Sequence, residues 1–181
     1  MPGRGPLFAR VLGDAAFSTL PQRVRALHLA RGRHAYAGEA EVEAGRRWLA
    51  RLCAWATGLP PSAARVPVRV EIVADDDTER WNRTFGRHRM PSRFRAHGGL
   101  LIERIGLVAF GFALFVRGGE LIWTVRRVRA LGVPLPARWF RGVTAREFEA
   151  DGRYRFEVEA TLPLIGLLVR YRGWLDVPAN G

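Results

Sequence analysis

Apolar and polar positions alternate with a period of two through most of the chain after residue 66, which predicts a succession of strands. The pattern is cleanest at residues 153–162, where aromatic and aliphatic side chains alternate with arginines and glutamates. Tight-turn dipeptides separate the strands at Gly98-Gly99, Gly118-Gly119 and Asp151-Gly152. These connections are too short for parallel crossovers, which need about a dozen residues. The strands are therefore expected to be antiparallel neighbours.

The first third of the chain carries the helical signals. A short helix is predicted to open at Pro21 and to stop at Gly32, before a strand that begins at His34. Residues 46–57 have apolar positions at helical spacing and end at Gly58. We predict a mainly β fold of the α+β type, a curved antiparallel sheet or barrel of about nine strands with two N-terminal helices, one of them packed on the sheet. Residues 1–20 are interpreted as a lead-in and residues 21–178 as one antiparallel β-rich domain.

The helix at residues 46–57 needs a surface to cover its apolar stripe. In the strand at residues 108–116 both faces are apolar, and one of them carries the small residues Ala109, Gly111 and Ala113. A face of small residues accepts a closely packed helix. We therefore expect the helix to pack on this face.

The formal net charge of +12 comes entirely from arginine, because all 29 basic residues are arginines. Residues 80–104 and 126–146 hold the excess, so one or two positive surfaces are expected. The longest uncharged stretch, residues 105–116, is too short for a transmembrane helix of about 20 residues. No signal peptide is evident, and the lone Cys53 forms no internal disulfide. These features predict a cytoplasmic protein with no transmembrane segment.

The residues that usually carry catalysis are scarce or badly placed. The absence of lysine excludes Schiff-base and P-loop lysine chemistry. No histidine pair has metal-ligand spacing on a helix, and no serine lies in a nucleophile elbow. The residues concerned are His28, His34, His88, His97, Ser18, Ser62 and Ser92. We predict surface or loop histidines, no catalytic residue, no metal and no cofactor.

Two charged residues interrupt apolar faces. Glu103 lies amid apolar neighbours beside Arg104, and Arg83 shares a strand face with Trp81 and Phe85. A buried charge is costly unless it is paired or contacts a ligand. For Glu103 we favour a structural ion pair over a general base.

The last strand presents a stripe of arginines that also needs explanation. Arg170 and Arg172 lie on its polar face, and Glu157 and Glu159 lie on the polar face of the preceding strand. The turn between the two strands brings these residues opposite each other. We predict structural cross-strand pairing for the arginines, with anion binding as the alternative.

Two stretches resemble a known family. The segment from Gly152 to Leu175, with its Leu162-Pro163-Leu164-Ile165-Gly166 turn, and the central Trp81-Asn82-Arg83-Thr84-Phe85-Gly86 are similar to the bacterial family of domain of unknown function DUF4166. The resemblance extends from about residue 20 over nearly all of the remaining chain. It implies a domain that stands alone or follows a saccharopine-dehydrogenase-like NAD(P)-binding domain, and it supplies no catalytic residues.

The favoured function is a binding module whose barrel encloses a small apolar or amphipathic ligand with an anionic head group. A cavity is expected beneath the strands of Tyr154 and Tyr171. The alternatives are nucleic-acid binding through the arginine-rich strands, which is the less favoured partner, and an accessory domain of an NAD(P)-dependent oxidoreductase. An enzyme would require His88 or His97 beside a carboxylate in a cavity. The candidate ligand-binding residues are Tyr36, Trp81, Arg83, Phe85, Trp123, Tyr154 and Tyr171.

Overall fold

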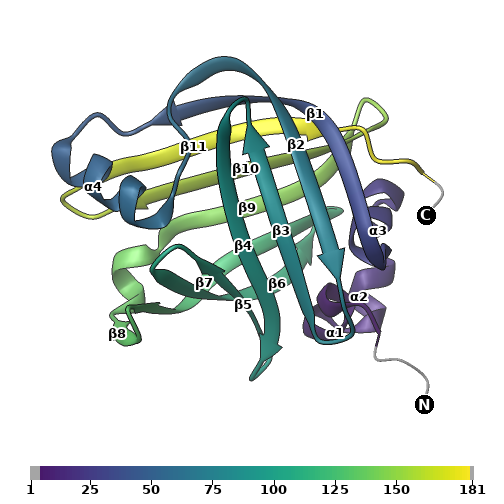
Figure 1. Ribbon diagram of the computed structural model, residues 1–181. Coiled ribbons are helices and arrows are strands. Elements are labelled where there is room, and N and C mark those ends of the chain that lie inside the picture. Colours follow the sequence, from purple (N-terminus) through teal and green to yellow (C-terminus); the bar gives the residue numbers. More distant parts are fainter. Residues whose placement is uncertain (1–4, 180–181) are drawn as a thin grey trace.

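The computed structural model describes residues 5–179 as a β-barrel with helices at its two ends (Figure 1). Period-two alternation gives each strand one face for the interior and one for the outside. The elements are α1 (Leu7–Leu12), α2 (Asp14–Ser18), α3 (Gln22–Leu29), β1 (Gly32–Ala44), α4 (Trp48–Thr57), β2 (Ala63–Ala74), β3 (Thr78–Phe85), β4 (His88–His97), β5 (Leu100–Ile105), β6 (Val108–Arg117), β7 (Glu120–Ala130), β8 (Val133–Leu135), the 3-10 helix η1 (Ala137–Phe140), β9 (Gly142–Ala150), β10 (Arg153–Leu162) and β11 (Gly166–Leu175).

Ten antiparallel strands close the barrel, and β8 is an additional short strand. The connection from β1 to β2 contains α4, and successive hairpins then join β2 to β7. β9 follows β7 in the sheet, and β11 returns to pair with β1. The first half of β7 pairs with β9, whereas its second half pairs with β8. The mainly β, antiparallel fold is confirmed, although the expected strand number was slightly low. β8 has only three residues and contains Pro134, so it has no alternation to detect.

The two ends of the barrel differ in what covers them (Figure 1). Helices α1, α2 and α3 lie at one end together with both termini, and we call this the N-terminal end. Helix α4 lies at the other end with the β10–β11 turn, β8 and η1. We call this the α4 end, and its connecting segments are residues 45–62, 86–87, 106–107, 131–141 and 163–165.

The N-terminal helices contribute directly to the core. Phe8 of α1 has no exposed surface and stacks on His28 of α3 with ring centroids 3.7 Å apart. Leu7 and Phe17 are also buried. The described part of the segment interpreted as a lead-in, residues 5–20, therefore packs against the barrel. The count of two N-terminal helices was wrong, since three helices precede β1 and α4 follows it.

The expected packing of α4 on the small-residue face of β6 was also wrong. Short connections hold α4 near the ends of β1 and β2, where it contacts β11. On β6, a side chain at Gly111 would meet Ile102 and Arg127, so the neighbouring strands already fill this face. Within α4 only Ala50 is buried, while Trp48 and Trp55 are 72% and 77% exposed. Its apolar stripe faces outward.

Glycines make the closing contact between β1 and β11 possible. Gly38 pairs with Leu175, and a Cβ atom at Gly38 would lie 1.9 Å from the Trp174 carbonyl oxygen. A Cβ at Gly173 would lie 2.3 Å from the Glu39 carbonyl oxygen. Both obstacles are backbone atoms, which cannot move aside as a flexible side chain can.

We expect Gly38→Ala to lower the free energy of unfolding by about 2–4 kcal/mol, because the methyl group forces the closing strands apart. Chemical denaturation measures this change. Gly5→Ala is the matched control, since a Cβ at Gly5 meets nothing within 4 Å. Equal stability of the two variants would show that the seam tolerates a side chain.

Candidate functional site

The barrel encloses a cavity of about 80 Å³ beneath the strands of Tyr154 and Tyr171, where one was expected. Its walls come from opposite sides of the barrel, with Val68 and Val70 on β2, Phe112 on β6 and Phe156 on β10. A cavity must have a volume of about 10–15 Å³ to hold one water molecule. The cavity is therefore larger than a single water site.

The cavity brings together six of the seven candidate ligand-binding residues. Tyr36 is buried on β1 but is not part of the lining. The six residues in the wall are Trp81, Arg83, Phe85, Trp123, Tyr154 and Tyr171. Their role in binding a ligand remains a prediction.

Arg83 is an ion-paired guanidinium inside an aromatic environment. Its Nη1 atom donates to Glu103 Oε1 at 3.1 Å and to Ser92 Oγ at 2.9 Å. Its guanidinium carbon lies 4.9 Å from the Trp81 ring centroid, a cation–π distance. Burial is the largest single influence and acts to lower the pKa of Arg83, but the charge and hydrogen bond of Glu103, together with Tyr171 and Tyr154, outweigh it and the pKa is raised. The ion pair expected for Glu103 is therefore present.

Three further buried polar residues were missed by the sequence analysis. His28 Nε2 lies 2.6 Å from Glu147 Oε2, and Trp81 Nε1 donates to Glu79 Oε2 at 2.9 Å. Burial raises the pKa of Glu79. The expectation of a surface or loop histidine was wrong for His28, which is 2% exposed. Glu147 could have been found, because it occupies the same strand face as the apolar Val143.

The cavity wall offers neutral hydrogen-bond donors. Burial raises the pKa of Tyr171 to about 12 and that of Tyr154 well above its ordinary value, so both phenols are protonated at neutral pH. The indole Nε1 of Trp123 is buried and has no hydrogen-bond partner among the described residues. A buried donor left unpaired costs about 1–3 kcal/mol. Trp123 is thus the group in the wall that most needs an acceptor.

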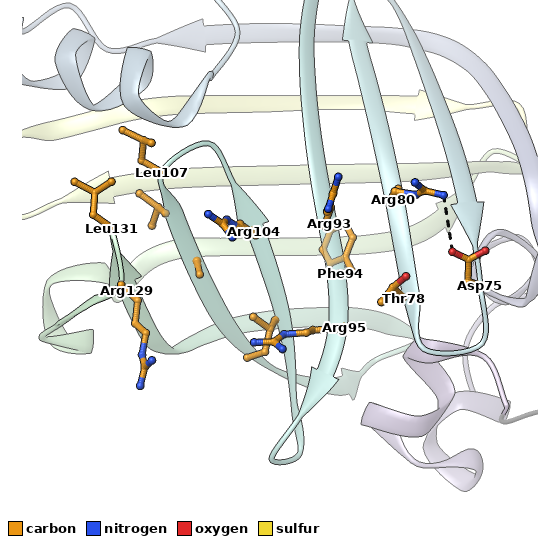
Figure 2. Close-up of a pocket in the computed structure, with 14 residues that line it drawn as sticks. Asp75, Thr78, Arg80, Arg93, Phe94, Arg95, Arg104, Leu107, Arg129 and Leu131 are labelled. Atoms are coloured by element: carbon orange, nitrogen blue, oxygen red, sulfur yellow. Dashed lines mark ion pairs between the residues drawn. The ribbon is translucent and has the colours of Figure 1, made fainter.

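A second hollow lies on the outside of the barrel and is strongly basic (Figure 2). It has a volume of about 690 Å³ and extends over β3 to β7. Arg80, Arg93 and Arg104 are direct cross-strand partners in one row, and Arg129 continues the row opposite Ala109. Figure 2 shows an ion pair for Arg80 with Asp75, at 3.9 Å. Like charges directly opposite each other are destabilising, so this row favours an anionic partner.

Most arginines on β9, β10 and β11 are matched by acids, in contrast to the row on β3–β7, and Arg153 lies over the Trp174 ring instead. Arg170 pairs with Glu159 at 3.0 Å, as expected from the sequence. Arg172 lies opposite Glu157 in the sheet, but its ion pair is with Glu41 of β1 at 2.9 Å. Glu157 instead binds Arg146 at 2.7 Å. Both arginines of the last strand are thus engaged in structural pairs.

The two histidines considered for catalysis lie apart from the cavity. His88 Nε2 contacts the Gly58 carbonyl oxygen at 2.8 Å, and His97 is exposed. Residues 5–179 contain no cluster of three or more His, Cys, Asp and Glu side chains that could hold a metal ion. None of the described helices is long and apolar enough to cross a bilayer.

The family model of domain of unknown function DUF4166 matches residues 20–175. The chain belongs to this family. A comparison with curated proteins gives no match. Among solved structures, the crystal structure of Rv2717c from M. tuberculosis is similar with a TM-score of 0.42 and 11% sequence identity, over 88% of this DUF4166 chain and 99% of that chain.

We expect Arg83→Met to reduce the free energy of unfolding by about 3–5 kcal/mol, because it leaves Glu103 charged and unpaired in the interior. Arg83→Met/Glu103→Leu should recover more than half of the loss, since neither charge then remains. Chemical denaturation of both variants is the measurement. Arg172→Gln is the control, because its exposed pair contributes less than about 1 kcal/mol. A double variant no more stable than Arg83→Met would contradict this account.

We expect the free energy of unfolding to fall in alkaline solution through Tyr171. Its folded pKa of about 12 lies above its ordinary value of 10.0, so the neutral phenol is the form that stabilises the fold. This contribution is complete below pH 10 and is lost as the pH rises towards 12, by up to about 2–3 kcal/mol. Denaturation curves at successive pH values measure it. Tyr171→Phe should show a shallower decline, and an identical decline would exclude Tyr171 as the cause.

Proposed function

We propose that this DUF4166 barrel binds one small apolar or amphipathic molecule in its interior cavity. The observation that carries the proposal is the unpartnered indole N–H of Trp123 in the cavity wall. Buried polar groups in native proteins nearly always have a hydrogen-bond partner. A ligand with a hydrogen-bond acceptor would satisfy this donor, while aromatic and aliphatic side chains contact its apolar part.

The charges in the wall favour an uncharged ligand over the anionic one expected from the sequence. Arg83 is paired with Glu103, and Arg146 is paired with Glu120 and Glu157. Glu147 also contributes to the wall. An anion entering the cavity would meet carboxylates without a free guanidinium to offset them. A carbonyl or ether oxygen carries no such cost.

The size of the cavity limits the ligand to a compact molecule. An apolar cavity of about 150 Å³ accepts benzene, and the volume here is about 80 Å³. In proportion, a molecule with about three or four non-hydrogen atoms is the expected scale. Acetone has this size, one acceptor and an apolar body, and it is a suitable probe.

The test follows the Trp123 indole signal in proton–nitrogen NMR spectra during a titration with acetone. The signal is assigned by its loss in Trp123→Phe. We expect a saturable shift of the Trp123 signal that exceeds the shifts of the other indoles. Trp123→Phe should weaken binding about tenfold, the effect of one buried hydrogen bond of about 1.4 kcal/mol.

Two further variants make the test decisive. Ala145→Leu places a larger side chain in the cavity wall and should abolish the response. Arg172→Gln lies on the outside of the barrel and should leave it unchanged. A Trp123 signal that does not respond in the wild-type chain, or that responds equally in Ala145→Leu, would overturn the proposal. Native mass spectrometry of protein purified from its own host can then identify a retained ligand.

A further inference from the structure

Apolar side chains left in solvent are concentrated at one end of the barrel. Of the ten exposed large hydrophobic residues among residues 5–179, nine lie at the α4 end and the exception is Leu29 of α3. Monomeric proteins rarely expose a contiguous apolar patch unless it contacts a protein or a membrane. The distribution therefore points to an interaction surface at this end.

The face of α4 that points away from the barrel has the composition of an interfacial helix. Trp48, Leu52 and Trp55 follow helical spacing on one face and are 72%, 52% and 77% exposed. Arg47 and Arg51 lie on the same helical segment. Tryptophan with arginine beside it is typical of helices that lie in the headgroup region of a bilayer.

Hydrogen bonds join the turns around α4 into one surface. The backbone N–H of Leu107 donates to the Ala56 carbonyl oxygen at 3.2 Å, and that of Leu131 donates to the Leu107 carbonyl oxygen at 2.9 Å. On the other side, Arg47 Nη1 donates to the Leu164 carbonyl oxygen at 2.7 Å. The β5–β6, β7–β8 and β10–β11 turns thus border the helix. Each of them carries an exposed leucine.

Two of these leucines combine exposure to water with an unfavourable backbone conformation. Leu131 and Leu164 have positive φ angles of 50° and 66°, a conformation that glycine or asparagine adopts more easily. Leu164 is also 94% exposed. At both turns the positive φ angle favours glycine or asparagine, and exposure to water favours a polar side chain. An apolar environment that covers the side chains would explain leucine at both positions.

The charges at the α4 end indicate which kind of partner fits this surface. Its connecting segments contain six arginines and no Asp or Glu. The arginine row of β3–β7 reaches this end as well, since Arg104 and Arg129 line the outer hollow together with Leu107 and Leu131 (Figure 2). The connecting segments of the opposite end, residues 5–31, 75–77, 98–99, 118–119, 151–152 and 176–179, hold four arginines against six aspartates, so that end lacks the positive charge of the α4 end.

From this combination we infer that the α4 end is a docking surface for a membrane that contains anionic lipids. The two tryptophans and the leucine turns enter the interface between headgroups and acyl chains. The arginines contact the lipid phosphates. A nucleic acid would match the arginines but not the apolar side chains, because exposed leucines have no partner on a phosphate backbone. The docking surface and the interior cavity share no residue, so the two proposals stand or fall separately.

The experiment is co-sedimentation of the full chain with vesicles of phosphatidylcholine alone and of an equimolar mixture of phosphatidylcholine and phosphatidylglycerol. We expect binding to the anionic vesicles only. Trp48→Ser/Trp55→Ser should reduce the partition coefficient by about tenfold for each tryptophan, and Arg46→Gln/Arg51→Gln by about fivefold for each arginine. All four side chains are exposed, so the fold should be retained, and circular dichroism verifies this.

Matched controls come from the N-terminal end. Leu29→Ser removes the remaining exposed hydrophobic residue, and Arg117→Gln removes an exposed arginine from the end of β6. Both variants should bind anionic vesicles as the wild type does. Brominated lipids provide a second readout, because they should quench the tryptophan fluorescence of the wild type more strongly than that of Trp48→Ser/Trp55→Ser.

Three results would overturn the inference. The first is no sedimentation of the wild-type chain with anionic vesicles. The second is equal sedimentation of the wild type and Trp48→Ser/Trp55→Ser. The third is tighter binding to single- or double-stranded DNA than to vesicles, with no effect of the tryptophan substitutions, which would assign the arginine surface to nucleic acid. Ala145→Leu should still dock, and this result separates the membrane surface from the cavity.

Discussion

Closure of the sheet is the constraint on which the rest of the molecule depends. A meander of ten strands would leave two open edges, and the pairing of β1 with β11 removes both. The backbones approach closely enough there that Gly38 and Gly173 have no room for a Cβ atom. Once closed, the barrel separates its interior from water. Every charge on an inward position then needs a partner, which is why Arg83 pairs with Glu103 and why Glu147 lies against the imidazole of His28.

Most of the sheet follows from period-two alternation, whereas the arrangement of its parts does not. The same alternation places Trp81, Arg83 and Phe85 on one inward face and identifies Arg83 as a buried charge. The partner of His28 could not be predicted, because α3 and β9 meet only through the closed barrel. The apolar stripe of α4 was misread for a related reason. Apolar spacing shows that one helix face avoids water, but it does not show whether protein or another apolar phase covers that face.

Strand register, unlike composition, shows where the net charge of the chain is located. On the side formed by β1, β11, β10 and β9, arginines and glutamates alternate across the strands and neutralise each other. On the side formed by β3 to β7, arginine follows arginine. Composition gives the summed charge of these two surfaces and does not show how the charge is divided between them. The excess charge is thus a local property of one side and one end of the barrel.

The opposite characters of the two ends give the molecule an electrostatic dipole along the barrel axis. The α4 end is cationic, and the β2–β3 and β9–β10 turns at the other end carry aspartates. In the field of an anionic body such a dipole experiences a torque before any contact is made. At physiological ionic strength this acts over about 8 Å, roughly the last nanometre of the approach. Within that distance the barrel turns its α4 end forward, so that a larger share of collisions occurs in one orientation.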